Sequence, residues 1–202
     1  EERDAQQAAI TDTRVAQPTL GIAGLAMFDV LSTVGVRPDL MAGHSYGELV
    51  ALAAAGVVGE AELLELSEAR ADAILGAAGE DPGTMAAVSG SADAVREALG
   101  AQTTVVVAND NSPSQAVISG TTPAVEAAVE RLGEAGLRAK RLPVACAFHS
   151  PVVAGAAATF GERLAAADLA EARVPVWSNT TAAPYPTDRD GVRATLGGQV
   201  AE

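Results

Sequence analysis

The apolar residues of this chain recur with two spacings, one typical of helices and one typical of strands. From Leu20 to Val34 they return every three to four positions, which predicts a helix that begins at Pro18 and ends at Gly35. Short runs rich in valine, bounded by glycine, proline or asparagine, are typical of strands. Helices are therefore expected over residues 18–35, 48–55, 60–77, 92–99, 123–135 and 151–169, and strands over residues 39–42, 84–88, 103–109, 115–119, 138–147 and 174–178.

The order of the expected elements changes along the chain. Residues 83–147 follow the order β-α-β-β-α-β, which is the split arrangement of ferredoxin-like folds. We interpret this block as a small subdomain inserted into a larger α/β unit. Residues 1–16 are polar and show no start signal, and a loop with a short helix is expected after residue 184.

Composition and charge narrow the classes of function. Hydrophobic residues make up 49% of the 202 residues, enough for a substantial core, and the net charge of −13 argues against nucleic acid and against an anionic membrane surface. No signal peptide is recognisable, and no apolar run is expected to be long enough to span a bilayer. The single cysteine, Cys146, permits no internal disulfide and favours a reducing, cytoplasmic location.

Residues 43–48 read Gly-His-Ser-Tyr-Gly-Glu and place Ser45 in a Gly-x-Ser-x-Gly pattern between an expected strand and an expected helix. A strand-to-helix turn of this kind exposes a serine hydroxyl as a nucleophile. The flanking glycines are expected because a side chain would collide in so tight a turn. The alternative is that Ser45 only caps the helix and that Glu48 completes a capping box, which is compatible with the first interpretation.

A nucleophilic serine needs a base that accepts its proton, and the chain has two histidines. His44 is adjacent to Ser45, and neighbouring residues in a tight turn point in different directions. His149, which follows an expected strand and precedes Pro151, is therefore the candidate base. The alternative for a lone histidine is a capped or core residue.

Arg70 falls on the apolar stripe of its predicted helix, between Leu66 and Ile74. A guanidinium on an inward face needs an anion or must extend to solvent. The planar fork of arginine suits both oxygens of a substrate carboxylate. The alternative is a structural ion pair with an aspartate or glutamate elsewhere in the chain.

Together these residues resemble the acyltransferase family of malonyl-CoA:acyl-carrier-protein transacylases, and more closely the acyltransferase domains of type I polyketide synthases. The similarity covers nearly the whole chain. Cys146 and Tyr46 are further similar to iterative synthases of the enediyne type. The matching positions are Gln17-Pro18, residues 35–39, residues 43–48, Arg70, residues 147–150, residues 178–182 and Gln199.

The resemblance implies an α/β fold with a hydrolase-like parallel-sheet core and an inserted ferredoxin-like subdomain. The core is expected to comprise residues 1–82 and 148–202 and to be incomplete at both ends, and the subdomain residues 83–147. The family's opening Pro-Gly-Gln-Gly-Ser segment, whose glutamine supplies one oxyanion N–H, has no counterpart in the sequence.

The resemblance also implies a role for each matching residue. Ser45 and His149 would form the catalytic dyad, and the backbone N–H of Tyr46 would supply half of the oxyanion hole. The remaining implied roles are carboxylate binding by Arg70, substrate binding by Gln17 and His44, preference for malonyl over methylmalonyl by Phe148, and orientation of His149 by the backbone carbonyl of Gln199.

The implied reaction carries a malonyl-type unit from coenzyme A to the phosphopantetheine thiol of an acyl carrier protein, in polyketide and antibiotic biosynthesis. The expected partners are malonyl-CoA, the carrier protein and neighbouring synthase domains such as a ketosynthase. The coenzyme A thioester is a substrate, and neither a permanently bound cofactor nor a metal site is expected.

Two other functions are compatible with parts of the sequence. An α/β-hydrolase esterase or thioesterase would use the same elbow, but its acid would have to come from Asp93 or Asp110, both inside the expected subdomain. A non-catalytic docking module of a megasynthase would keep the fold without the chemistry. Intact Ser45, Arg70 and His149 favour the enzyme over this last alternative.

Overall fold

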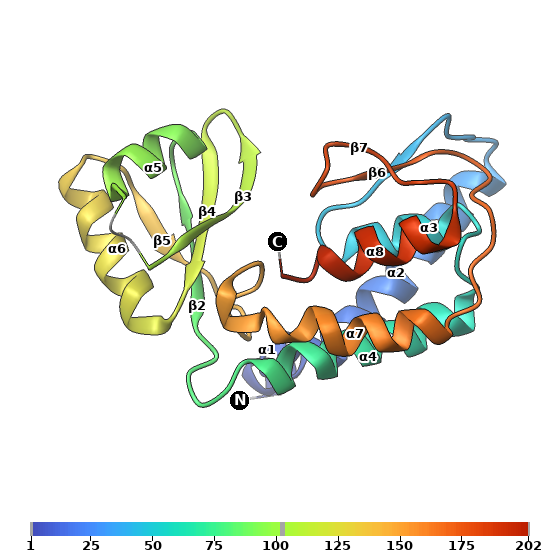
Figure 1. Cartoon of the computed structure of the whole chain (residues 1–202), viewed down its shortest axis with the longest axis horizontal. Helices are drawn as coiled ribbons and strands as arrows, with labels where there is room; N and C mark the ends of the chain where they lie inside the picture. The colour runs from blue at the N-terminus through green and yellow to red at the C-terminus, as the bar shows by residue number, and fades with distance from the viewer. Residues whose placement is uncertain (1, 102–103, 202) are drawn as a thin grey trace. The chain divides into compact units, whose positions relative to one another are not determined.

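The computed structural model describes residues 2–101 and 104–201, and the chain divides into two compact units (Figure 1). The first unit comprises Glu1–Ala73 and Ala157–Val200, and the second comprises Ile74–Ala156 and Ala201–Glu202. The boundaries fall inside α4 (Glu60–Ala77) and α7 (Gly155–Ala166). Each unit is described below by itself.

The first unit contains a small mixed sheet with the order β1-β6-β7. Strand β1 (Met41–Ala42) pairs parallel with β6 (Val176–Ser178), and β7 (Ala183–Pro184) pairs antiparallel with β6. In the register, Met41 is opposite Val176. The expected strands at residues 39–42 and 174–178 therefore exist in shortened form, and their C-terminal ends lie at the same edge of the sheet.

The helices of this unit supply most of its apolar core. They are α1 (Glu2–Thr11), α2 (Thr13–Thr33), α3 (Gly47–Ala54), α8 (Arg189–Gly198) and the parts of α4 and α7 that belong to this unit. Helix α3 leaves the sheet directly after β1 and packs against it. The largest fully buried apolar side chains are Leu49, Leu52, Leu63, Leu66, Phe160, Leu164, Leu169 and Leu196.

Helix α2 corrects two expectations. It begins at Thr13, where the Asp12 carboxylate accepts a hydrogen bond from the Arg14 N–H at 2.9 Å, and Pro18 lies inside it rather than at its start. By length and mean hydropathy, its 21 residues could also cross a membrane, so the expectation of no such apolar run was wrong. Core helices of soluble proteins have the same length and composition, so this property alone assigns no membrane span.

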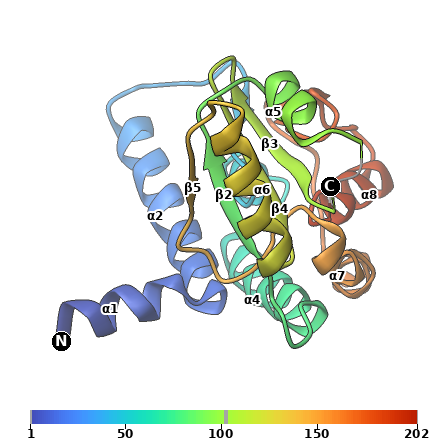
Figure 2. The ribbon, with the colours of Figure 1, turned by 90° about the vertical axis from the view of Figure 1, so that its left-hand side faces the viewer.

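The second unit is built on a four-stranded antiparallel sheet with the order β3-β4-β2-β5 within the described part of the chain. The helices α5 and α6 cover the sheet, and Figure 2 shows α6 lying across it. Along the chain the elements are β2 (Thr84–Val88), α5 (Ala92–Leu99), β3 (Val106–Ser112), β4 (Gln115–Gly120), α6 (Thr122–Glu134) and β5 (Ala139–Arg141). The β-α-β-β-α-β order read from the sequence is therefore present.

Local sequence explains where the helices of this unit begin and end. The Ser91 hydroxyl accepts a hydrogen bond from the Ala94 N–H at 3.2 Å and starts α5, and Gly100 ends it with a φ of 67°. Val95, Ile118 and Leu132 are completely buried between the helices and the sheet. The helical spacing of apolar residues was thus sufficient to predict the ends of α5 and α6 to within one residue.

Two strands of this unit differ from expectation. Strand β5 covers only three residues, because Pro143 cannot donate to a strand ladder and the chain then turns toward the short 3₁₀ helix η1 (Pro151–Val153). Strand β3 covers Val106–Ser112 and so extends beyond the expected end at residue 109. The expected start at Thr103 lies outside the described residues.

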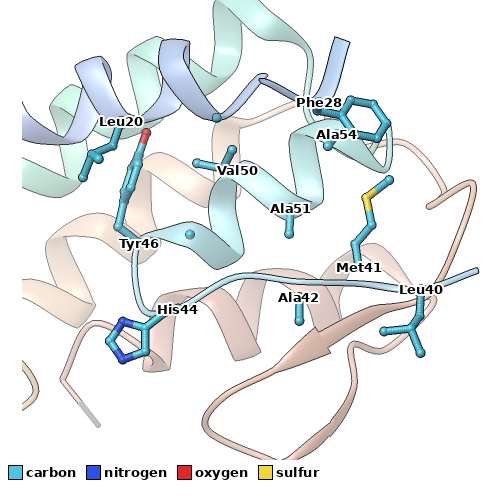
Figure 3. Close-up of a pocket in the computed structure, with 12 residues that line it drawn as sticks. Leu20, Phe28, Leu40, Met41, Ala42, His44, Tyr46, Val50, Ala51 and Ala54 are labelled. Carbon is cyan, nitrogen blue, oxygen red and sulfur yellow. The ribbon is translucent and has the colours of Figure 1, made fainter. Parts of the chain in front are cut away.

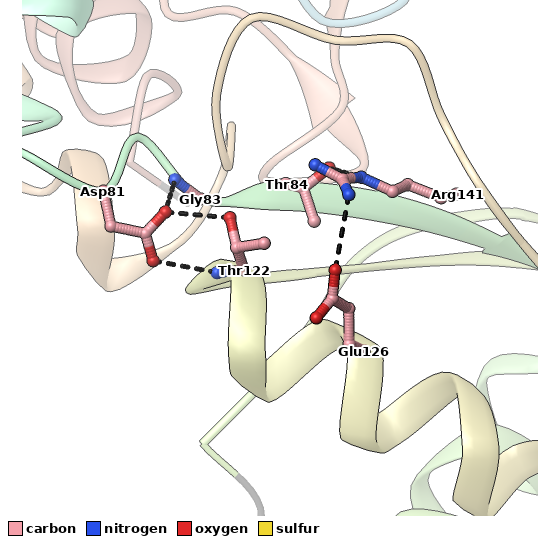
Figure 4. A network of polar contacts seen from close by, with 6 residues as sticks. All are labelled: Asp81, Gly83, Thr84, Thr122, Glu126 and Arg141. Carbon is pink, nitrogen blue, oxygen red and sulfur yellow. Dashed lines mark hydrogen bonds and ion pairs between the residues drawn. The ribbon is translucent and has the colours of Figure 1, made fainter.

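A polar network fixes the entrance to β2 (Figure 4). The Asp81 carboxylate accepts hydrogen bonds from the Gly83 N–H at 2.9 Å, the Thr122 hydroxyl at 2.8 Å and the Thr122 N–H at 3.0 Å. Asp81 thereby joins the segment before β2 to the first turn of α6. These hydrogen bonds, that of the Gly83 N–H above all, hold the pKa of Asp81 below its usual value.

We expect Asp81→Asn to make the second unit less stable at neutral pH and less sensitive to acid. A carboxylate whose folded pKa is depressed stabilises the fold above its unfolded pKa and loses that contribution as the pH falls through the folded value. Thermal unfolding from pH 7 to pH 2.5 measures this. A variant whose melting temperature falls as steeply with acid as that of the original protein would contradict the prediction.

Candidate functional site

Ser45 stands at the turn from β1 into α3 with a φ of 52°. This left-handed conformation is rare for a residue other than glycine and is typical of functional turns. The turn is closed by two backbone hydrogen bonds, from the Gly47 N–H to the His44 carbonyl at 2.8 Å and from the Glu48 N–H to the Ser45 carbonyl at 3.0 Å. The strand–turn–helix context expected for a serine elbow is therefore present.

The two glycines of the elbow are needed to different degrees. A Cβ on Gly43 would stand 1.9 Å from the Gly47 carbonyl oxygen, which excludes any side chain. A Cβ on Gly47 would meet no atom within 4 Å. The expected collision is thus present at Gly43, and the same expectation for Gly47 was wrong because the Cβ position of Gly47 faces open space.

The capping-box interpretation of Ser45 and Glu48 was also wrong. The Ser45 N–H donates to the side-chain oxygen of Asn179 at 2.8 Å, not to Glu48. The Glu48 carboxylate, completely buried, accepts from the Asn179 N–H at 2.7 Å and from the Tyr185 hydroxyl. Burial raises the pKa of Glu48, while the hydrogen bonds from Tyr185 and Asn179 oppose the rise.

Tyr46 directs its ring into the first unit. Its hydroxyl bonds to Ser67 at 2.7 Å, and since the Ser67 hydroxyl donates to the Leu63 carbonyl, Tyr46 is the donor of this pair. The guanidinium carbon of Arg70 lies 5.9 Å from the centre of the Tyr46 ring, within the range of a cation–π interaction. In the hydrogen bonds of the elbow described above, the donors are the backbone N–H groups of residues 45, 47 and 48. The backbone N–H of Tyr46 is not a donor in these bonds.

Arg70 is 2% exposed and is held by two glutamines. Its terminal nitrogens donate to the side-chain oxygens of Gln17 and Gln199, each at 3.1 Å. Gln17 is oriented in turn by donating to the Thr13 hydroxyl at 2.7 Å. Both amides are neutral, so these contacts fix the fork of the guanidinium without cancelling its charge.

A pocket of about 510 Å³ opens between α2, β1 and α3 in the first unit (Figure 3). Its lining is mostly apolar, with Tyr46 and Leu20 at one end and Phe28 and Met41 at the other. His44 lines it too, and its side chain is exposed. This is where the structure places His44, which was expected to bind substrate.

His149 belongs to the second unit and, like Ser45, adopts a left-handed conformation, with a φ of 54°. It is 7% exposed. Its turn is tied on both sides, because the Ser119 hydroxyl donates to the Phe148 carbonyl at 2.7 Å and the Ser150 hydroxyl donates to the Ala147 carbonyl at 2.7 Å. Ser45 and His149 lie in different units, so their pairing stays a prediction.

The structure thus brings together some of the expected site residues. Arg70 contacts both Gln17 and Gln199, and it lies against Tyr46. The proposed contact of the Gln199 backbone with His149 would join the two units and also stays a prediction. Among the residues that the structure describes, no group of three or more histidine, cysteine, aspartate or glutamate residues could hold a metal ion.

Sequence reasoning assigned no role to Asn179, Tyr185, Ser67 or Ser119. Asn179 was visible only as part of residues 178–182, and nothing in its spacing indicated that it would contact Ser45. The parallel pairing of β6 with β1 brings it there, because both strands end at the same edge of the sheet.

A protein-family model described as an acyl transferase domain matches residues 3–194. The chain belongs to the acyl transferase family. The resemblance read from the sequence is therefore confirmed, and the hydrolase alternative is not favoured. This acyl transferase chain spans little more than half of the length of several of the relatives that it matches.

Three relatives illustrate the similarity of this acyl transferase chain. The malonyl CoA-acyl carrier protein transacylase of Synechocystis sp. is 40% identical over 88% of the chain and 59% of that protein. The acyltransferase domain of an iterative polyketide synthase in enediyne biosynthesis gives a TM-score of 0.85 at 35% identity, over 96% of this chain and 52% of the other. A malonyl-transacylase solved with a type II polyketide acyl-carrier protein gives 0.88 at 31% identity, over 97% and 65%.

We expect Gly43→Ala to cost more than about 3 kcal/mol of unfolding free energy, because the added methyl group meets backbone that cannot move aside cheaply. Gly47→Ala is the matched control and should be stabilising by about 0.4–1 kcal/mol, since its helical position accepts a side chain. Urea unfolding of both variants measures the difference. Equal stabilities would show that the elbow can relax around Gly43.

Proposed function

We propose that this domain carries a malonyl-type unit from coenzyme A, through an ester on Ser45, to the phosphopantetheine thiol of an acyl carrier protein in polyketide biosynthesis. The observation that carries the proposal is the buried guanidinium of Arg70, fixed by two neutral amides in the unit that holds the serine elbow. A simple esterase has no use for such a cation. Among the relatives, those named above as malonyl transacylases support the same assignment.

In the first half of the proposed reaction, the Ser45 hydroxyl attacks the thioester carbonyl of malonyl-CoA while His149 accepts its proton. The negative charge that develops on the carbonyl oxygen is stabilised by the Tyr46 N–H, which the bonds of the elbow leave out. The C–S bond then breaks, and coenzyme A leaves as the thiol after His149 returns the proton. The product is a malonyl ester of Ser45.

In the second half, the carrier-protein thiol gives its proton to His149 and attacks the ester. The C–O bond breaks, the proton passes to the Ser45 oxygen, and the malonyl thioester departs on the carrier protein. The left-handed turns at Ser45 and His149 are consistent with two side chains that the fold presents in fixed directions. Gln199 is proposed to orient His149 through its backbone carbonyl.

Arg70 is proposed to bind the free carboxylate of the malonyl group. Gln17 and Gln199 each accept from one terminal nitrogen and so fix the orientation of the planar guanidinium, whose fork can also bind the two oxygens of a carboxylate. His44 and Phe148 are proposed to line the acyl site, where Phe148 would leave no room for a methyl branch. Such a pocket discriminates one methyl group by about 1–3 kcal/mol.

The wider assignment follows from the same proposal. Residues 1–82 and 148–202 would form a hydrolase-like core, and residues 83–147 a ferredoxin-like subdomain, as the strand order β3-β4-β2-β5 supports. The domain would act in the cytoplasm beside a ketosynthase, with coenzyme A thioester as a substrate and without a bound cofactor. The structural neighbour from enediyne biosynthesis supports an iterative synthase.

The proposal predicts that malonyl-CoA labels this chain at Ser45. Intact-protein mass spectrometry after mixing with equal malonyl-CoA and methylmalonyl-CoA should show mainly the malonyl adduct, because Phe148 narrows the site. Ser45→Ala should remove the adduct, and His149→Ala should slow its formation by about 100- to 10,000-fold. An adduct that persists in Ser45→Ala would exclude the proposed nucleophile.

A second prediction concerns the selectivity conferred by Arg70. In Arg70→Ala the ratio of malonyl to acetyl labelling of Ser45 should fall about 10- to 100-fold, since hydrogen bonds between the guanidinium and the carboxylate are lost. The ratio is measured within one sample, so partial unfolding of the variant cancels. An unchanged ratio would show that Arg70 is a structural residue only.

A further inference from the structure

A closed ring of hydrogen bonds fixes both backbone groups of Ser45. The Ser45 N–H donates to the Asn179 side chain at 2.8 Å, and the Asn179 N–H donates to Glu48 Oε1 at 2.7 Å. The Glu48 N–H donates back to the Ser45 carbonyl at 3.0 Å. Three segments take part, namely the elbow, the first turn of α3 and the residue that follows β6.

Tyr185 completes the ring from the interior of the unit. Its hydroxyl donates to Glu48 Oε2. Glu48 and Ser178 are completely buried and Tyr185 is 7% exposed. One oxygen of the Glu48 carboxylate therefore accepts a hydrogen bond from the segment after β6, and the other accepts one from the segment after β7.

The position of this ring matters because Ser45 has a left-handed backbone. A non-glycine residue remains in that conformation only when its surroundings over-determine it. Of the residues that surround Ser45 here, Asn179 holds its N–H and Glu48 its carbonyl. A charged acceptor gives stronger and more directional bonds than a neutral one, which suits a carboxylate for this task.

Packing alone does not explain a carboxylate in this place. A buried carboxylate is costly to desolvate, and an apolar side chain of similar volume is often at least as stabilising. Burial raises the pKa of both Glu48 and Tyr185, as expected for two polar groups removed from water. The cost is offset by the bonds to Asn179 and Tyr185, and the result is a fixed direction for Ser45.

We propose that Glu48 and Tyr185 are positioning residues that act through Asn179 to hold the Ser45 hydroxyl in its attacking direction. Neither residue touches the substrate in this assignment. The inference rests on the proposed function only in taking Ser45 as the nucleophile. It predicts that weakening the ring slows attack by Ser45 without changing how tightly malonyl-CoA binds.

The first test compares the full chain with Tyr185→Phe and Asn179→Ala in single-turnover acylation by malonyl-CoA, followed by rapid quench and intact-protein mass spectrometry. A misplaced nucleophile should lower the maximal rate about 10- to 100-fold. The half-saturating concentration of malonyl-CoA should stay within about twofold, since ground-state binding is unaffected. Losses confined to the half-saturating concentration would overturn the proposal.

The double variant Tyr185→Phe/Asn179→Ala tests whether the residues act as one unit. Its rate should lie within about threefold of the rate of the slower single variant, because the effects of residues in one network are not additive. Fully multiplicative losses would contradict a shared ring. Val95→Ala, in the core of the second unit, is the stability control and should lower the melting temperature without a matching loss of rate.

A second probe separates this inference from the proposed function. A fluorophosphonate forms a P–O bond with an activated serine and releases fluoride, without needing a coenzyme A site or Arg70. If the original chain is labelled at Ser45 by the fluorophosphonate but not by malonyl-CoA, the proposed function fails, and the labelling rates of the variants still decide the role of the ring. Equal labelling of the original chain and Tyr185→Phe, or no labelling of Ser45 by either reagent, would overturn the inference.

Discussion

The close approach of Gly43 to the carbonyl of Gly47 is the constraint on which the site depends. The chain must reverse between β1 and α3 within a few residues. A Cβ on Gly43 would stand 1.9 Å from the Gly47 carbonyl oxygen, so only glycine fits at this position. At this reversal Ser45 has a left-handed backbone, as in the tight turns that expose a nucleophilic serine. Asn179 and Glu48 then hold the backbone of Ser45 in this conformation through its N–H and its carbonyl.

The first unit also keeps two ionisable side chains, Arg70 and Glu48, where apolar residues would pack more cheaply. Both form hydrogen bonds with neutral groups, namely two amides for the guanidinium, and a phenol and a backbone N–H for the carboxylate. Such partners fix direction without neutralising charge. Burying these two groups lowers the stability that packing could provide, but their hydrogen bonds fix the orientation of side chains around the elbow. Groups held in fixed orientations are what differential stabilisation of a transition state requires.

The two units differ in how they hold their site residues. In the first, long-range side-chain bonds between segments far apart in sequence position Ser45 and Arg70. In the second, side chain-to-backbone and backbone bonds hold the turn of His149. The Ser150 hydroxyl bonds to Ala147 only three residues away, whereas the Ser119 hydroxyl and the Pro82 carbonyl reach the turn from farther along the chain. Large apolar residues of α2, such as Met27 and Val30, are exposed, so the first unit leaves part of its apolar surface uncovered.

The sequence by itself determined the helices α4, α5 and α6, the antiparallel block of the second unit, the elbow serine and the family, because these depend on periodicity and on motifs that are contiguous or nearly so. It also indicated Arg70, since an arginine on an apolar stripe is conspicuous in one dimension. The start of α2 at Thr13, the freedom of Gly47 and the partners of Glu48 were decided only by the tertiary structure. Asn179 meets Ser45, and Gln199 meets Arg70, across more than half of the chain. The pairing of β6 with β1 brings Asn179 to Ser45, and the packing of α8 brings Gln199 to Arg70. No local pattern of residues predicts contacts between positions so far apart in the sequence.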